Sequence, residues 1–260
     1  MRTMEYRIIE SLREFELATD LEIAVWGLNP RDAVPVNLMR ALHHAGGVMI
    51  GAYDGAPLVG IAFAFPARME DRVILWSHMT GIRHDYQGQG VGFELKLRQR
   101  EWALANGYDQ IGWTFDPLQR GNANFNLHCL GATSGSYHEN FYGFMEDEIN
   151  HAGLPSDRVE ALWHLHDPHV VQRAAGIFPA EALMNPPFLL RDQGTPLVTA
   201  LDQTQSEYLV QIPRTLSAMD DQAVLRWRLA LREALTSAFA SGCVAVDFTA
   251  NNAYLLRRLY

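Results

Sequence analysis

The stretch ILWSHMTGIRHDYQGQGVG, residues Ile74 to Gly92, constrains the fold of this chain more than any other segment. Its first residues form an apolar run that predicts a buried strand. A glycine-rich turn follows at positions 87–92. A pattern typical of a helix then extends to Asn106-Gly107, a pair that favours a helix end. The sequence therefore predicts a strand, a tight glycine loop and a helix in direct succession.

A loop that opens a helix presents backbone N–H groups at the positive end of the helix dipole. This arrangement favours an anion such as phosphate. Glycine allows the backbone to approach the anion closely and to adopt positive φ where the turn needs it. Taken alone, the glycine spacing is equally compatible with a plain turn between a strand and a helix.

The spacing of the glycines distinguishes between the known classes of phosphate-binding loop. They fall at positions 88, 90 and 92, whereas a dinucleotide-binding loop needs G-x-G-x-x-G, and position 93 is Phe93. No Lys-Ser or Lys-Thr pair follows, as a Walker loop would require. The pattern Gln87-x-x-Gly90-x-Gly92 resembles the acyl-CoA pyrophosphate loop of the GNAT superfamily of N-acyltransferases, in which Arg or Gln precedes x-x-Gly-x-Gly or Ala.

The order of predicted elements resembles the same superfamily over residues 4–150. Apolar periodicity and local signals predict a strand, two helices, three strands, a helix, a strand, a helix and a strand. Among these signals, Ser11 and Glu14 form a capping-box pattern, and Asp54-Gly55 between two apolar runs indicates a hairpin turn. The ranges are 6–9, 11–26, 36–45, 48–53, 58–66, 73–82, 91–106, 110–115, 122–130 and 134–142. The resemblance implies an α/β (α+β) fold with a GNAT-like mixed, mostly antiparallel sheet flanked by helices.

The last third of the chain has a pattern of its own. We expect residues 1–150 to form the GNAT acyl-CoA-binding catalytic domain and residues 151–260 to form a C-terminal extension. Strands are expected at 159–165, 197–200, 208–212 and 243–249, a helix at 220–241, and irregular structure at 167–194. The extension could form a small second domain, extend the first sheet, close the substrate pocket or make a homodimer.

Composition excludes several classes of protein. A net charge of −9 argues against nucleic acid or an anionic membrane as the main partner. Cys129 and Cys243 are far apart and match neither a disulfide framework nor a zinc site, so we expect no metal. The first residues are too charged for a signal peptide, and no apolar run approaches the roughly 20 residues that span a bilayer. We therefore expect a cytoplasmic protein.

The resemblance implies that acyl-CoA is bound by the strand before the loop and by the loop itself. Thr80 and Ile82 are expected to contact the pantetheine arm and the acyl carbonyl through their main chain. The loop residues expected to hold the pyrophosphate are Gln87, Gly88, Gln89, Gly90, Val91 and Gly92. Asn122 and Asn126, near the start of a later helix, could cap that helix, contact CoA or lie on the solvated surface.

Transfer of an acyl group from a thioester to an amine is helped by a base for the amine. His78 is the first candidate, because strand alternation predicts that it shares a face with Thr80 and Ile82. Asp116, at the end of the next predicted strand, is the second candidate. Each has a structural alternative: a core or edge histidine, and a turn residue before Pro117.

The acid that would protonate the leaving thiolate is less clear from the sequence. Many members of the superfamily place a tyrosine in the fourth helix, but alignment on Leu130-Gly131-Ala132 puts Leu127 at this position. Tyr137 or Tyr142 could substitute, although packing within a strand is the favoured interpretation of either residue. A thiol of pKa about 8.5 is also a tolerable leaving group at neutral pH.

Three longer runs, WTFDPLQRGNANFNLHCLGA, YHENFYG and GLPSDR, resemble one bacterial GNAT branch with a C-terminal extension. That branch is linked to N-succinylation of amino acids, including D-amino acids. The resemblance implies acetyl-CoA or succinyl-CoA as co-substrate and a small amine as acceptor. Arg158, Arg120 or Arg83 could bind the free carboxylates, since the guanidinium fork matches a carboxylate. Surface solvation, or a loop contact between Asp157 and Arg158, is the alternative.

Two other functions fit the same residues. An ordinary acetyltransferase for a peptide or metabolite amine needs the same CoA loop. The missing helix tyrosine also allows a non-catalytic GNAT-like module that binds acyl-CoA as a sensor.

Overall fold

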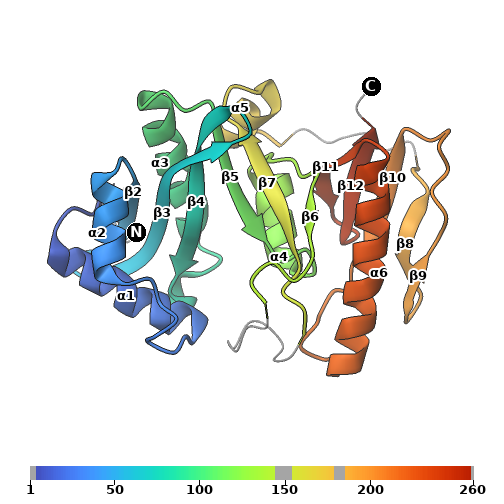
Figure 1. The fold of residues 1–260 in the computed structure, drawn as a ribbon, viewed down its shortest axis with the longest axis horizontal. Coiled ribbons are helices and arrows are strands. Elements are labelled where there is room, and N and C mark those ends of the chain that lie inside the picture. The colour runs from blue at the N-terminus through green and yellow to red at the C-terminus, as the bar shows by residue number, and fades with distance from the viewer. Residues whose placement is uncertain (1–3, 144–153, 179–184, 259–260) are drawn as a thin grey trace. The chain divides into compact units, whose positions relative to one another are not determined.

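The computed structural model describes residues 4–143, 154–178 and 185–258 (Figure 1). Contacts between residues divide the chain into two compact units, and the division falls within β5 (Gln110–Phe115), between Trp113 and Thr114. The boundary that the sequence predicted, between residues 150 and 151, lies outside the described residues.

The first unit follows the predicted order of elements. They are β1 (Met4–Ile8), α1 (Leu12–Trp26), α2 (Val36–His44), β2 (Val48–Asp54), β3 (Leu58–Met69), β4 (Arg72–Ile82), a 3₁₀ turn (His84–Tyr86), α3 (Val91–Ala105) and β5. The predicted capping box opens α1: Ser11 Oγ accepts from Glu14 N at 3.3 Å, and the Glu14 carboxylate accepts from Ser11 N at 3.1 Å. Gly27 ends the helix at φ +64°, a conformation that favours glycine.

The strands of the first unit pair in the order β1-β2-β3-β4-β5, antiparallel up to β4 and parallel between β4 and β5. Helices α1 and α2 cover one face, where Phe15 of α1 and Met39 of α2 share a buried core with Phe63 of β3. Helix α3 covers the other face, since a Cβ at Gly60 of β3 would lie 3.1 Å from Leu95 Cδ1. The two faces of β3 and β4 therefore have different neighbours.

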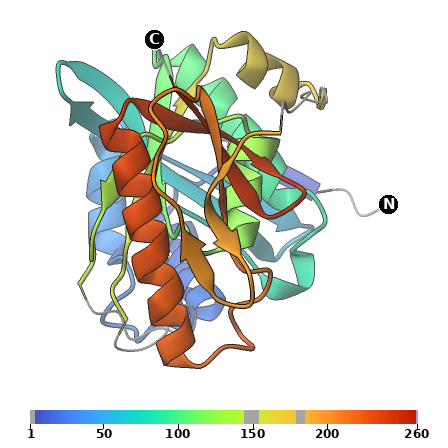
Figure 2. The same ribbon diagram turned by 90° about the vertical axis from the view of Figure 1, so that its right-hand side faces the viewer.

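The second unit consists mainly of strands and one long helix. Its elements after β5 are α4 (Arg120–Ala123), a π-helical turn (Asn124–Cys129), β6 (Tyr137–His138), β7 (Arg158–His164), α5 (Pro168–Ala174), β8 (Phe188–Asp192), β9 (Pro196–Val198), β10 (Glu207–Gln211), α6 (Asp221–Ala240), β11 (Cys243–Thr249) and β12 (Ala253–Arg258). Five strands form a sheet in the order β11-β12-β10-β8-β9. Helix α6 packs against this sheet, through the buried residues Trp227, Leu231 and Leu235 among others, and Figure 2 looks onto this packing.

The fold class is confirmed as a mixed, mostly antiparallel α/β structure with a C-terminal strand–helix–strand segment. Two local predictions are wrong. The strand expected at 134–142 is reduced to the two residues of β6, and Ser134 forms only an isolated bridge with Ala245. The region 167–194, expected to be irregular, contains α5 and β8. Asp167 starts α5 by accepting from His169 N at 2.8 Å, and a proline occupies the first turn.

Among the described residues, no helix combines the length and the apolar character that crossing a membrane requires.

Candidate functional site

The glycine loop turns the chain from β4 into α3 with an open helix N-terminus. Gly88 and Gly90 have φ of +71° and +82°, values that a side chain at either position would strain. The first bond of the helix runs from Glu94 N to Gly90 O at 3.0 Å, so the N–H groups of Val91, Gly92 and Phe93 precede the intrahelical ladder. Gly90, the N-cap residue of α3, brings no side chain that could accept from them. This geometry suits an oxyanion at the positive end of the α3 dipole.

Side chains of the loop hold its backbone in place. Gln87 Nε2 donates to Ile82 O at 3.1 Å, and Gln89 Nε2 donates to Asp85 O at 2.8 Å. Tyr86 is buried beneath the loop, and its hydroxyl donates to Asp54 Oδ2 at 2.8 Å. The two glutamines therefore brace the turn, and it is the loop backbone that can receive an anion.

Strand β4 pairs with β5 over a short distance. The parallel register covers Leu75 with Ile111 and Trp76 with Gly112. Beyond these pairs, the part of β4 that contains Thr80 and Ile82 pairs with β3. Ile82 pairs with Gly60 on the face that α3 covers, and Thr80, two residues earlier, points the same way. Thr80, Ile82 and the loop thus form one continuous segment.

His78 lies in a bulge of β4. Met79 pairs with Phe63 and Ser77 pairs with Ala64, so His78 is an extra residue that reverses the alternation of the strand. Its imidazole packs against Phe63 and Phe65, with ring centroids 6.3 and 5.9 Å away. These rings belong to the face covered by α1 and α2. The prediction that His78 shares a face with Thr80 and Ile82 is therefore wrong.

The imidazole of His78 is only partly shielded. The residue keeps an exposed surface, while the aromatic rings beside it desolvate the imidazole enough to lower its pKa below the usual value. A lowered pKa keeps the ring neutral near pH 7, which is the form that can accept a proton.

Lys96 is a buried residue of this unit that the sequence analysis did not single out. It projects from α3 and donates to Ser77 Oγ at 3.1 Å and to Gln99 Oε1 at 2.6 Å. Its ammonium nitrogen lies 3.9 Å from the centroid of the Trp113 ring. Burial lowers its pKa to about 7. A signal was present in the sequence, because Lys96 is its only lysine and follows the apolar Leu95.

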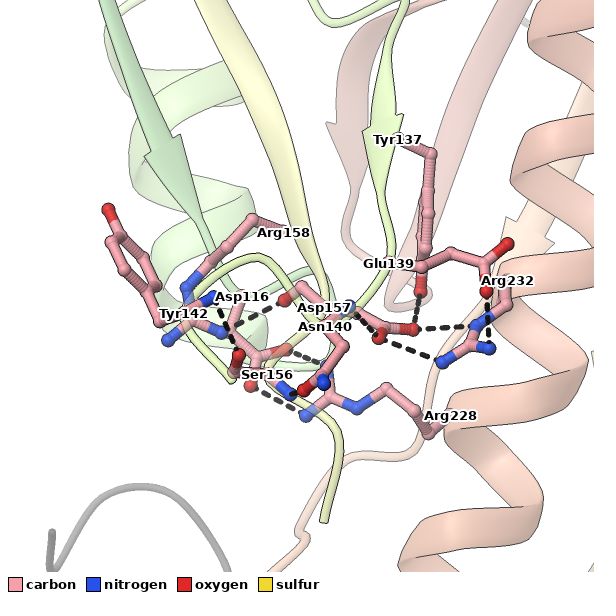
Figure 3. A network of polar contacts seen from close by, with 10 residues as sticks. All are labelled: Asp116, Tyr137, Glu139, Asn140, Tyr142, Ser156, Asp157, Arg158, Arg228 and Arg232. Atoms are coloured by element: carbon pink, nitrogen blue, oxygen red, sulfur yellow. Dashed lines mark hydrogen bonds and ion pairs between the residues drawn. The ribbon is translucent and has the colours of Figure 1, made fainter. Parts of the chain in front are cut away.

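The second unit holds the other candidate residues in a network of ion pairs around α6 (Figure 3). Both carboxylate oxygens of Asp116 are engaged by Arg228, at 2.5 and 2.8 Å, and both residues are buried. Asp116 Oδ1 also accepts from Leu118 N at 2.9 Å. Tyr254 of β12 supports the same turn by donating to Pro117 O at 2.6 Å.

A second bidentate pair joins α6 to the chain before β7. Arg232 donates to both oxygens of the fully buried Asp157 at 2.9 Å each, and to Glu139 at 2.7 Å (Figure 3). Tyr137 donates to the same Asp157 at 2.6 Å. Burial, reinforced by this carboxylate, raises the pKa of Tyr137 well above its usual range.

Tyr142 and Arg158 lie together in the same network. The Tyr142 hydroxyl is 3.2 Å from Thr114 Oγ1, and its backbone N–H donates to Ser156 Oγ at 2.9 Å. The Arg158 guanidinium lies 5.2 Å from the centroid of the Tyr142 ring and donates to Asp157 O at 2.9 Å. Tyr142 is exposed whereas Arg158 is buried.

The remaining candidates surround the short helix α4 and the π-helical turn. Arg120 is exposed and donates to Asn252 Oδ1 at 3.2 Å. Asn122 is exposed, whereas Asn126 is buried. Leu127, where the family pattern would have a tyrosine, is fully buried. Asp116, Tyr142 and Arg158 thus belong to one network of the second unit, whereas the loop, Thr80, Ile82 and His78 belong to the first.

Comparison with known proteins identifies the fold. No protein-family profile and no curated protein matches the chain. A Salmonella typhimurium protein described as an acetyltransferase, solved with its cofactor acetyl-CoA, matches with a TM-score of 0.50 at 15% identity, over 63% of this chain and 95% of that chain. A GNAT-family protein from Desulfovibrio desulfuricans, described as an acetyltransferase, matches with 0.49 at 12% identity, over 63% and 99% of the two chains. The chain therefore shares its fold with the Salmonella typhimurium protein, which the order of elements in the first unit is consistent with.

Proposed function

We propose that this chain is an acyl-CoA-dependent N-acyltransferase that moves an acetyl or succinyl group to the amine of a small molecule, most simply an amino acid. The observation that carries the proposal is the open N-terminus of α3. Gly88 and Gly90 adopt positive φ there, and the N–H groups of the first helical turn directly follow this glycine loop. A CoA pyrophosphate is an anion of the right kind for such a site. The GNAT-like fold supports the same interpretation.

The reaction has one bond made and one broken. The amine nitrogen attacks the thioester carbonyl carbon and gives up a proton to the base. The C–N bond forms, the C–S bond breaks, and CoA leaves as a thiolate that gains a proton. In this proposal the pyrophosphate binds residues 87–92, and main-chain groups of Thr80 and Ile82 hold the pantetheine arm and polarise the carbonyl. Asn122 and Asn126 are proposed as further CoA contacts. No metal is needed for this chemistry.

His78 is the favoured base. Its lowered pKa keeps the imidazole neutral at pH 7, and the β4 bulge gives it an exposed position. Asp116 is less suited to this role, because Arg228 engages both of its oxygens. Tyr142 is the proposed acid for the thiolate, since its hydroxyl is on an exposed side chain.

The proposed binding of the substrates depends on arginine side chains. We propose that Arg158 and Arg120 bind the free carboxylates of a succinyl donor or an amino acid. Arg120 is exposed and donates to the neutral side chain of Asn252, which leaves the charge of the guanidinium available to a carboxylate. We further propose that residues 1–150 form the catalytic domain. Residues 151–260 are proposed to form an extension that closes the substrate pocket or makes a homodimer. The proposed location of the protein is the cytoplasm.

The proposal is tested by measuring the binding of CoA species and then the release of thiol from their thioesters. Thermal unfolding is followed with CoA, acetyl-CoA and succinyl-CoA, because a ligand that binds only the native state raises its stability. Release of free thiol is then measured for each thioester with panels of L-amino acids, D-amino acids, amines and peptides. A stabilising donor with amine-dependent thiol release supports the proposal and names both substrates. Absence of stabilisation by every CoA species contradicts it.

The structure supplies a matched pair of variants for the loop. Gly90 and Gly107 have φ of +82° and +80°, and a Cβ at either would meet no atom within 4 Å. Gly90→Leu and Gly107→Leu therefore introduce the same backbone strain at opposite ends of α3. Gly90→Leu should abolish CoA binding while Gly107→Leu retains it. Equal CoA affinity in the two variants would refute the loop as the pyrophosphate site.

A sensor remains the second candidate function because of Leu127. The buried leucine occupies the position at which the family pattern supplies its usual acid. Stabilisation by a CoA thioester without thiol release on any acceptor would favour this function.

A further inference from the structure

Arg173 of α5 is completely buried, and its charge is incompletely matched. Asp247 of β11 forms an ion pair with it, with Arg173 Nη2 and Asp247 Oδ2 3.5 Å apart. Within the part of the chain that the structure describes, Nε, Nη1 and Nη2 all lack a hydrogen-bond acceptor. A buried guanidinium carries five N–H donors and is costly to leave unsatisfied. An acceptor at this place would therefore be strongly favoured.

Asp247 cannot supply all that Arg173 requires. Its Oδ1 lies 3.0 Å from His128 Nδ1 and accepts from Phe248 N at 2.7 Å, so the carboxylate is already shared. Phe178 covers the guanidinium, with its ring centroid 5.2 Å from Arg173 Cζ, and stacks on His128 at 5.9 Å. Three elements that are distant in the sequence thus enclose one cationic group.

A second unsatisfied group lies next to Arg173. His169 is four residues earlier on α5, which places the two side chains on one face, and its buried Nε2 also lacks a partner among the described residues. Gly131 lies against both: a Cβ there would be 3.0 Å from His169 Cδ2 and 3.3 Å from Arg173 Cγ. The missing side chain of this glycine lets both side chains pack closely against the backbone.

We propose that Arg173 and His169 form a binding site for a small oxyanion, a carboxylate or a phosphate. Arginine can only donate hydrogen bonds, so its missing partner must be an acceptor. The planar fork formed by Nε and Nη1 matches two oxygens of a carboxylate or phosphate, and His169 Nε2 can donate to the same anion. Asp247, which also contacts His128, forms an ion pair with Nη2 of the guanidinium, and the Phe178 ring lies over the guanidinium.

This site is made only of residues of the second unit and shares none with the glycine loop. The proposal therefore stands whether or not the chain transfers acyl groups. It predicts that a free oxyanion stabilises the protein through Arg173.

Thermal unfolding with sodium phosphate and with sodium succinate tests the site, at an ionic strength held constant with sodium chloride. The wild-type protein should show a saturable rise in Tm with at least one of the two anions, on the order of 5 °C at about 100 times Kd. Phosphate and succinate are separate arms because they distinguish a phosphate ligand from a carboxylate ligand. Absence of a saturable rise in both arms would mean that water alone satisfies these donors.

Two variants and one matched control locate the site. Arg173→Met keeps a long side chain without donors and should lose the response, and His169→Ala should weaken binding at least several-fold and serves if Arg173→Met does not fold. Arg226→Met removes an exposed arginine of the same unit and should respond like wild type. A full response in both Arg173→Met and His169→Ala would overturn the proposal. Loss of the response in Gly90→Leu would also overturn it, because the anion would then be binding at α3.

Discussion

The buried residue Lys96 should make the free energy of unfolding depend on pH. Its Nζ reaches Ser77 Oγ and Gln99 Oε1 and lies over the Trp113 ring, and burial lowers its pKa from 10.5 to about 7. The unfolded chain holds the proton up to about pH 10.5, whereas the folded chain releases it near pH 7. Between these values the unfolded state binds more protons, so the free energy of unfolding should rise with pH.

The magnitude follows from the two pKa values. The difference, 10.5 − 7, is about 3.5 pKa units and corresponds to about 5 kcal/mol in total, or about 1.4 kcal/mol for each pH unit. The two hydrogen bonds and the Trp113 ring favour the charged form, so this value is a ceiling. From pH 7 to pH 9 we expect a gain of about 1 to 2 kcal/mol from this lysine. Below pH 7 both states are protonated and its contribution becomes flat.

The assay is urea unfolding of wild type and Lys96→Met at pH 7, 8 and 9. The difference between the two pH slopes isolates Lys96, since other titrating groups are common to both proteins. Lys96→Met should have the flatter slope, and Arg98→Met, which removes an exposed charge of the same helix, should keep the wild-type slope. Equal slopes in wild type and Lys96→Met would show that the folded protein keeps the lysine protonated, which would refute the reasoning.

Two further predictions concern His78 and the pair formed by Asp116 and Arg228. His78→Ala should lower the acylation rate by about 10²- to 10⁴-fold without changing CoA affinity and should remove the fall in rate at low pH, with exposed His44→Ala as control. An unchanged rate would exclude His78 as the base. Arg228→Met should destabilise the protein by about 3 to 5 kcal/mol in urea unfolding, because it leaves Asp116 buried and unpaired. Adding Asp116→Asn should recover much of that loss, and a double variant as unstable as the sum of both changes would contradict this view.

Local sequence signals predicted the parts of the fold that depend on neighbouring residues. Ser11 and Glu14 form the predicted capping box, and the predicted Asp54-Gly55 turn joins β2 to β3. Gly88 and Gly90 adopt the positive φ values that the loop pattern allowed. Such features are set by interactions within a few residues, which a pattern of residue types can represent. The same reasoning failed for α5, where a proline-rich composition concealed an Asp-Pro helix start.

Tertiary structure decided the features that depend on partners far apart in the chain. The prediction from strand alternation placed His78 on the wrong face of the sheet, because a bulge in β4 reverses the alternation at this residue. A bulge is defined by the pairing of β4 with β3, which the sequence of β4 does not contain. The sequence marked Asp116 as a candidate base but gave no sign that Arg228, 112 residues later, would engage it.

The sequence by itself thus determined the glycine loop and the order of elements in the first unit, since each follows from local propensity and hydrophobic period. Only the tertiary structure decided which charged side chains are buried and which groups form ion pairs or hydrogen bonds with them. The ion pair of Asp116, the pKa of Lys96 and the unsatisfied donors of Arg173 are examples. The physical reason is that desolvation and ion pairing depend on distances in space, and these are fixed only when distant segments pack together.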